Sequence, residues 1–109
     1  MDLQPGETAI DTWTLIYTPP AGGNVNGKLT VTNRRLLYDA KFDASLIGML
    51  GHYAASGKLV IDKADIASVE VQRKLLSKKA ILTLADGSVH IFNYGAMNID
   101  RVVAAIEAR

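Results

Sequence analysis

The sequence predicts a mainly β domain (α+β by content), in which a bent seven-stranded antiparallel sheet or partial barrel is capped by one C-terminal α-helix. Three observations support this fold class. The chain has 109 residues, which suits one domain spanning residues 1–109. Short stretches with strand composition or alternating apolar and polar residues follow one another as far as Tyr94. From Asn98 onward the apolar residues recur with the period of a helix instead.

The predicted strands are recognised by composition and by alternation. Residues 7–18 are rich in threonine, aromatic and β-branched residues, which suit a pleated and half-buried surface. Trp13 and Tyr17 fall on one face of this strand, so we expect both in the core. Leu29 and Val31 show the same alternation in the second strand. The seven strands are predicted at residues 7–18, 27–32, 35–42, 58–62, 66–72, 79–85 and 88–94.

Two short turns are expected between these strands. Asp86 and Gly87 tolerate positive φ angles, so the pair predicts a two-residue type I′ hairpin. Asn33 and Arg34 predict a second tight turn, with Arg34 and Arg35 solvated.

The C-terminal helix has an apolar stripe and a capping signal. Asn98 is the expected N-cap, and Asp100 suits the positive end of the helix dipole. The stripe consists of Ile99, Val102, Val103 and Ile106.

Composition excludes several classes of function. A formal net charge of +1 argues against a dedicated nucleic-acid binder. The absence of cysteine removes disulfides, thiolate zinc sites and cysteine nucleophiles. His52 and His90 have no metal-like spacing with acids, and His90 is expected at the surface or in a cross-strand pair. We therefore predict no enzyme activity, catalytic residue, cofactor, metal or small-molecule substrate. Without a signal peptide or membrane-spanning stretch, a cytoplasmic location is expected.

The stretch GKLTVTNRRLLY at residues 27–38 resembles the second and third strands of bacterial pleckstrin-homology-like and GRAM domains. Residues 59–61 and 64–70 are similar to their fourth and fifth strands, and the Asp86-Gly87 hairpin and closing helix complete the order. The resemblance covers the chain from about Gly6 to the end. It implies a pleckstrin-homology-like fold and a non-catalytic module for lipid binding, protein binding or assembly, in which oligomers are common.

The sequence departs from the phosphoinositide-binding members of this family. Those members carry several basic residues around the first hairpin loop, where they bind phosphates. The corresponding residues 18–26 include no lysine or arginine here. We therefore do not expect specific inositol-phosphate binding in that pocket.

The first candidate site is the basic turn at residues 73–79. It contains four of the twelve basic residues and no acid. Two leucines flanked by cations have the composition of a contact with an anionic membrane. The favoured interpretation is instead a solvated tip whose leucines pack back on the domain or lie in a protein interface. The candidate lipid contacts are Arg73, Lys74, Leu75, Leu76, Lys78 and Lys79.

The second candidate site is the apolar segment at residues 42–55. It is too apolar for an ordinary exposed loop, so it either covers the core, which we favour, or forms an exposed interaction patch. The candidate interface residues are Leu46, Ile47, Met49, Leu50 and Tyr53.

The sequence thus favours a binding or assembly module whose partner is another protein or a second copy of the chain. The alternative is peripheral binding to anionic phospholipid at the inner face of the membrane. Exposure of Leu75 and Leu76 to solvent is what the lipid alternative predicts.

Overall fold

Seven strands and one α-helix make up the computed structural model, which describes residues 3–20, 22–40 and 58–108. They run in the order β1 (Ala9–Thr18), β2 (Val25–Thr32), β3 (Arg35–Ala40), β4 (Lys58–Asp62), the 3₁₀ turn η3 (Lys63–Asp65), β5 (Ile66–Lys74), β6 (Ser77–Leu84), β7 (Val89–Asn93) and α2 (Asp100–Glu107). This confirms the predicted class, a mainly β fold with one C-terminal helix.

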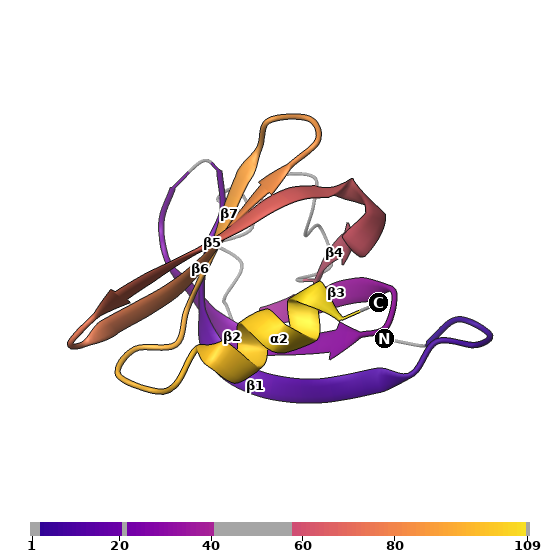
Figure 1. The fold of residues 1–109 in the computed structure, drawn as a ribbon, viewed down its shortest axis with the longest axis horizontal. Helices are drawn as coiled ribbons and strands as arrows, with labels where there is room; N and C mark the ends of the chain where they lie inside the picture. Colours follow the sequence, from indigo (N-terminus) through magenta and orange to yellow (C-terminus); the bar gives the residue numbers. More distant parts are fainter. Residues whose placement is uncertain (1–2, 21, 41–57, 109) are drawn as a thin grey trace.

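All strand pairs are antiparallel, and the sheet order is β4-β3-β2-β1-β7-β6-β5. β1 joins the two halves of the sheet. It pairs with β2 along most of its length, but with β7 only through Ile16, Tyr17 and Thr18. The sheet therefore bends at the end of β1, so that β5–β7 cross over β1–β4, with α2 beside the opening (Figure 1).

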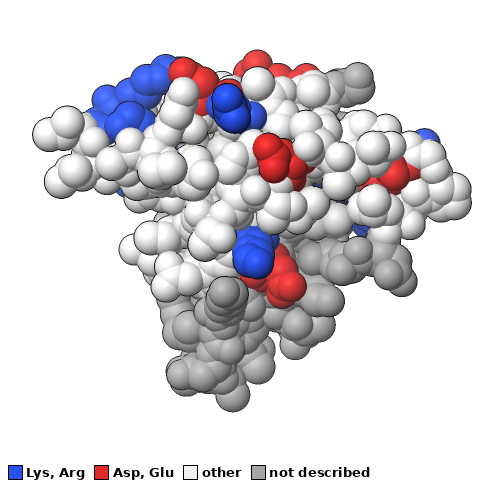
Figure 2. All heavy atoms as spheres, turned by 90° about the horizontal axis from the view of Figure 1, so that it is seen from below, with Lys and Arg blue, Asp and Glu red and all other residues white. Residues whose placement is uncertain are grey.

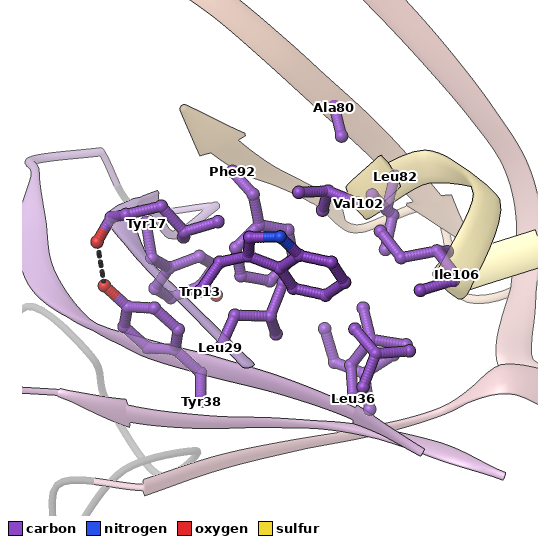
Figure 3. Packing of buried hydrophobic residues seen from close by; sticks show 14 of the residues in the cluster. Trp13, Tyr17, Leu29, Leu36, Tyr38, Ala80, Leu82, Phe92, Val102 and Ile106 are labelled. Atoms are coloured by element: carbon purple, nitrogen blue, oxygen red, sulfur yellow. Dashed lines mark hydrogen bonds between the residues drawn. The ribbon is translucent and has the colours of Figure 1, made fainter. Parts of the chain in front are cut away.

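The core lies between these two halves, as the alternation of apolar residues predicts. Trp13 and Tyr17 are buried, which confirms their predicted core role. Tyr17 packs against Phe92 of β7 and Tyr38 of β3, with ring centroids 5.2 Å apart in each pair. Figure 3 shows side chains from both halves of the sheet and from α2 meeting in this cluster. The aromatic rings thus fill the bend of the sheet.

Both ends of α2 are held by side-chain hydrogen bonds. At its start, Ile99 is the N-cap, so the prediction of Asn98 is wrong by one residue; the Asn98 Oδ1 atom accepts instead from the backbone N–H of Asp100 at 2.9 Å. At its end, the buried Lys63 ammonium of η3 donates to the Ala105 carbonyl at 2.7 Å and to the Ala108 carbonyl. The inner face of the helix is formed by Val102, Ala105 and Ile106, with Val103 half-buried.

The predicted type I′ turn at Asp86-Gly87 is wrong. The Gly87 N–H donates to the Leu84 carbonyl, and the Leu84 N–H donates to the Ser88 carbonyl, each at 2.9 Å, so the loop has three residues. Only Gly87 has a positive φ, of 87°, whereas a type I′ turn needs two such residues. The Asp86 carboxylate accepts from the Ser88 N–H at 2.9 Å, which favours the longer loop.

The predicted solvation of Arg34 and Arg35 is correct only for Arg34. Arg34 is exposed, but Arg35 turns inward and pairs with the buried carboxylate of Glu7 at 2.6 Å. The first strand begins at Ala9 and not at the predicted residue 7, so Glu7 lies in the segment before it.

Candidate functional site

The basic turn at residues 73–79 is the end of a long β-hairpin. Lys74 pairs with Ser77, which leaves Leu75 and Leu76 as a two-residue turn. Their exposed fractions are 85% and 76%. Of the two arms of the favoured interpretation, packing of these leucines back on the domain is therefore wrong, whereas a protein interface at this turn stays a prediction. We call residues 73–79 the β5–β6 tip; in Figure 1 it projects at the left.

The cations of the β5–β6 tip lie on paired strand ends instead of in a loop. Arg73 is directly opposite Lys78, and Lys79 is opposite Gln72. Because side chains alternate along a strand, Arg73 and Lys78 share one face, and Lys74 and Lys79 share the other. Both faces of the hairpin end are thus basic. Like charges directly opposite one another destabilise a strand pair, so the hairpin alone does not explain this arrangement.

The two faces differ in their partners. Arg73 forms an exposed ion pair with Asp100 at the start of α2. The Lys78 ammonium donates to the carbonyls of Leu75 at 3.4 Å and Ala96 at 3.2 Å. Among the described residues, no carboxylate lies within ion-pair distance of Lys74 or Lys79. These two ammonium groups are available to an external anion.

The connection between β7 and α2 lies beside the β5–β6 tip (Figure 1). The Lys78 N–H donates to the Gly95 carbonyl at 2.8 Å, and the Tyr94 N–H donates to the Lys78 carbonyl at 2.9 Å. This connection presents Met97, whose exposed fraction is 59%. Met97 is not among the residues predicted from sequence. A large apolar residue between the turn residues Gly95 and Asn98 was the available signal.

Charge is unevenly distributed over the chain. Removing the four cations of the β5–β6 tip from the twelve basic residues leaves eight against eleven acidic ones. Figure 2 shows basic atoms gathered at the end of the molecule where the β5–β6 hairpin projects, with uncharged atoms beyond them. A basic tip therefore projects from a mildly acidic body.

The second candidate site, with Leu46, Ile47, Met49, Leu50 and Tyr53, lies outside the described residues. His52 lies there too. The protein interface predicted on this segment stays a prediction.

His90 is buried, so the expectation of a surface position is wrong, although it does form a cross-strand pair with Leu82. Its Nδ1 atom is 2.6 Å from the Tyr17 hydroxyl, and its Nε2 atom is 3.1 Å from the Ser88 hydroxyl. The Ser88 hydroxyl in turn donates to the Asp86 carboxylate at 2.6 Å. Burial lowers the pKa of His90, which favours the neutral ring.

This hydrogen-bonded chain differs from a nucleophile–base–acid triad. In a triad the carboxylate orients the histidine, and the histidine activates the serine. Here Asp86 accepts from Ser88 itself, while a tyrosine hydroxyl occupies the other histidine nitrogen. The chain therefore has the connectivity of a structural network that satisfies buried polar groups.

Residues 3–20, 22–40 and 58–108 hold no group of three or more His, Cys, Asp or Glu side chains placed to bind a metal ion. No helix in these ranges has the length and apolar content needed to cross a bilayer.

Comparison with known proteins bears on the fold alone. No protein-family model matches the chain, and no curated protein matches it. Among solved structures, the chain is similar to the C-terminal domain of an unknown protein from Leishmania infantum. The TM-score is 0.69 at 13% identity, and the match covers 94% of this chain and 83% of that one. At such low identity the likeness supports the shared architecture.

Proposed function

We propose that the protein is a non-catalytic binding module of the pleckstrin-homology-like type, which binds peripherally to anionic membrane lipid through the β5–β6 tip. The observation that carries the proposal is the exposure of Leu75 and Leu76 between four cations. This reverses the order of preference expected from sequence, where a protein partner came first. The proposal places the protein at the inner face of the cell membrane.

The apolar part of the proposed contact is the leucine turn. An exposed apolar side chain gains about 25 cal/mol for each Å² that it removes from water. Leu75 and Leu76 lie at the extreme end of the hairpin, so both can enter the headgroup region while the rest of the domain stays outside. A folded domain gains nothing from leaving two adjacent leucines in water, which supports a binding role for them.

The basic part of the proposed contact makes it selective for anionic surfaces. Each cation close to such a surface contributes about 1 kcal/mol, and the contribution falls off within a Debye length. Lys74 and Lys79 are available for this role because they lack an ion-pair partner in the described residues.

We expect the double substitution L75S/L76S to weaken binding to vesicles of phosphatidylcholine with phosphatidylserine by about tenfold or more, because two apolar anchors are lost. The double substitution K74E/K79E should also weaken vesicle binding, since it replaces attraction by repulsion. The difference in binding from the unmodified protein should grow as the salt concentration falls, because the charges are then screened less. The measurement is co-sedimentation with vesicles over a range of salt concentrations.

Matched controls use exposed residues away from the β5–β6 tip. V89S removes an exposed apolar side chain on β7, and K28E/R34E makes the same change in net charge as K74E/K79E. Both controls should bind like the unmodified protein. Binding that ignores lipid charge, or that survives L75S/L76S unchanged, would overturn the proposal. So would a dimer that the leucine substitutions dissolve, because the β5–β6 tip would then be a protein interface.

A second candidate function is self-association along β5. This nine-residue strand is at the edge of the sheet and has mostly exposed side chains, and such edges can pair with another chain. Light scattering at high micromolar concentration checks it. A dimer that L75S/L76S leaves intact supports this candidate, and a monomer excludes it.

A further inference from the structure

The three most exposed large apolar side chains of the described residues come from two neighbouring connections. Leu75 and Leu76 form the β5–β6 turn, and Met97 lies between β7 and α2. The connections are far apart in sequence, but the β7–α2 connection is hydrogen-bonded to Lys78 of β6, two residues after the leucine turn. Exposed apolar residues are therefore concentrated at one end of the molecule.

Lys78 joins the two connections with its backbone and its side chain. Its ammonium donates to the carbonyls of Leu75 and Ala96, one from each connection. Although Lys78 was predicted as a lipid contact, its charge is directed at protein oxygens. This geometry fixes the position of the Met97 connection relative to the leucine turn, and it makes Lys78 a positioning residue.

The connection that contains Met97 lies against one face of the β5–β6 tip. Arg73 and Lys78 are on the face of the hairpin that meets this connection and the start of α2. On this face Arg73 is paired with Asp100 and Lys78 donates to carbonyl oxygens, so the exposed Met97 adds apolar surface beside cations that are already engaged. Methionine is flexible and polarisable, so it adapts to an irregular environment such as the headgroup boundary.

We infer that the β7–α2 connection is a second membrane-contacting element, which inserts Met97 beside Leu75 and Leu76 and is held in place by Lys78. This inference depends on the proposed membrane function, whose occupant is an anionic phospholipid surface. It adds a second point of contact. Contact through both the leucine turn and the β7–α2 connection fixes the orientation of the domain on the bilayer. Contact through the hairpin end alone would leave the domain free to rotate about that end.

The chain contains no cysteine, so a single introduced thiol can carry an environment-sensitive fluorophore without background labelling. We would label L75C, M97C and, as a control, V89C, and add vesicles containing phosphatidylserine. We expect a blue shift and quenching by brominated lipid at positions 75 and 97, and none at 89. M97S should also weaken vesicle binding about fivefold, whereas V89S should not.

The outcomes separate this inference from the proposal on which it depends. A response at position 75 without one at 97 overturns the second contact and leaves the membrane function standing. No response at either position overturns both. If M97C shifts on adding a soluble protein extract but not on adding vesicles, the surface binds protein and both proposals fail.

The role of Lys78 has its own comparison. K78Q and K79Q remove the same charge, but only K78Q removes the hydrogen bonds to Leu75 and Ala96. We expect K78Q to reduce the blue shift at position 97 while that at position 75 persists, and K79Q to leave the ratio of the two shifts unchanged. If both substitutions have equal effects on the two blue shifts, Lys78 contributes only its charge and does not position the connection.

Discussion

Replacing Lys63 with methionine should lower the free energy of unfolding by about 3 kcal/mol, because two hydrogen bonds from a charged donor are lost. The Lys63 ammonium donates to the carbonyls of Ala105 and Ala108 at the end of α2. These carbonyls carry the negative end of the helix dipole, so a cation suits the position. Ala105 is buried, and water therefore cannot easily replace the lost donor at its carbonyl.

Urea denaturation of K63M measures this effect. K28M is the matched control, since Lys28 is exposed on β2 and the same side chain is introduced. Hydrogen exchange adds a local readout: the amides of the last turn of α2 should exchange faster in K63M than in K28M. Stability equal to that of K28M would show that the desolvation cost of the buried ammonium cancels its hydrogen bonds.

Much of the fold could be predicted because local pattern and tertiary structure agree. In β1, Trp13, Leu15 and Tyr17 occupy every second position, and parity alone places them on the buried face. The stripe of α2 predicts its inner surface in the same way, except that Ala105 is more buried than Val103. Turn geometry was less accessible, because Asp86-Gly87 is compatible with both two-residue and three-residue loops.

His90 and Lys63 are buried polar side chains whose environment depends on distant parts of the chain. His90 meets Tyr17, which is 73 positions away, and Lys63 meets the end of α2. No local pattern indicates that such polar side chains are buried, since their burial depends on a partner supplied by another element. Sequence alone therefore underestimates the buried polar contacts of this domain.

The candidate site was predictable in composition but not in geometry. The sequence identifies four cations and two leucines at residues 73–79. The exposure of Leu75 depends on the register of β5 and β6, because the pairing of Lys74 with Ser77 places both leucines in a two-residue turn at the end of the hairpin. The proximity of Met97 to the leucine turn depends on the pairing of β6 with β7, which brings Gly95 beside Lys78 and which no single strand encodes.

The Glu7 carboxylate shows how far a distant partner can alter a charged side chain. Arg35 donates to both oxygens, from Nε at 2.8 Å and Nη2 at 2.6 Å. The Thr32 hydroxyl and the Gln4 N–H donate to the same carboxylate at 2.7 Å and 2.8 Å. Chiefly through the hydrogen bonds from Arg35, the pKa of Glu7 is lowered from 4.5 to about 2. The carboxylate thereby fixes the segment before β1 to the β2–β3 turn.

Acidification should therefore lower the free energy of unfolding in part by protonating Glu7, and the substitution E7Q should remove this part of the pH dependence. Because the folded pKa of Glu7 is below its ordinary value, its contribution to stability is complete above about pH 4.5 and is lost as the pH falls toward about 2. At neutral pH, E7Q should be clearly less stable than the unmodified protein. The two stabilities should converge as the pH is lowered through this interval.

Urea denaturation at a series of pH values tests the convergence, with E107Q as a control because Glu107 is exposed.

Other groups also contribute to acid sensitivity. Burial lowers the pKa of His90, so its contribution is lost as the pH falls below its ordinary value of 6.5. Hydrogen bonds from Ser88 lower the pKa of Asp86. Since both groups are present in every variant, the difference between the unmodified protein and E7Q isolates Glu7. A difference that stays constant between pH 4.5 and 2 would mean that the Glu7 carboxylate gains nothing from Arg35, and that E7Q acts only through packing.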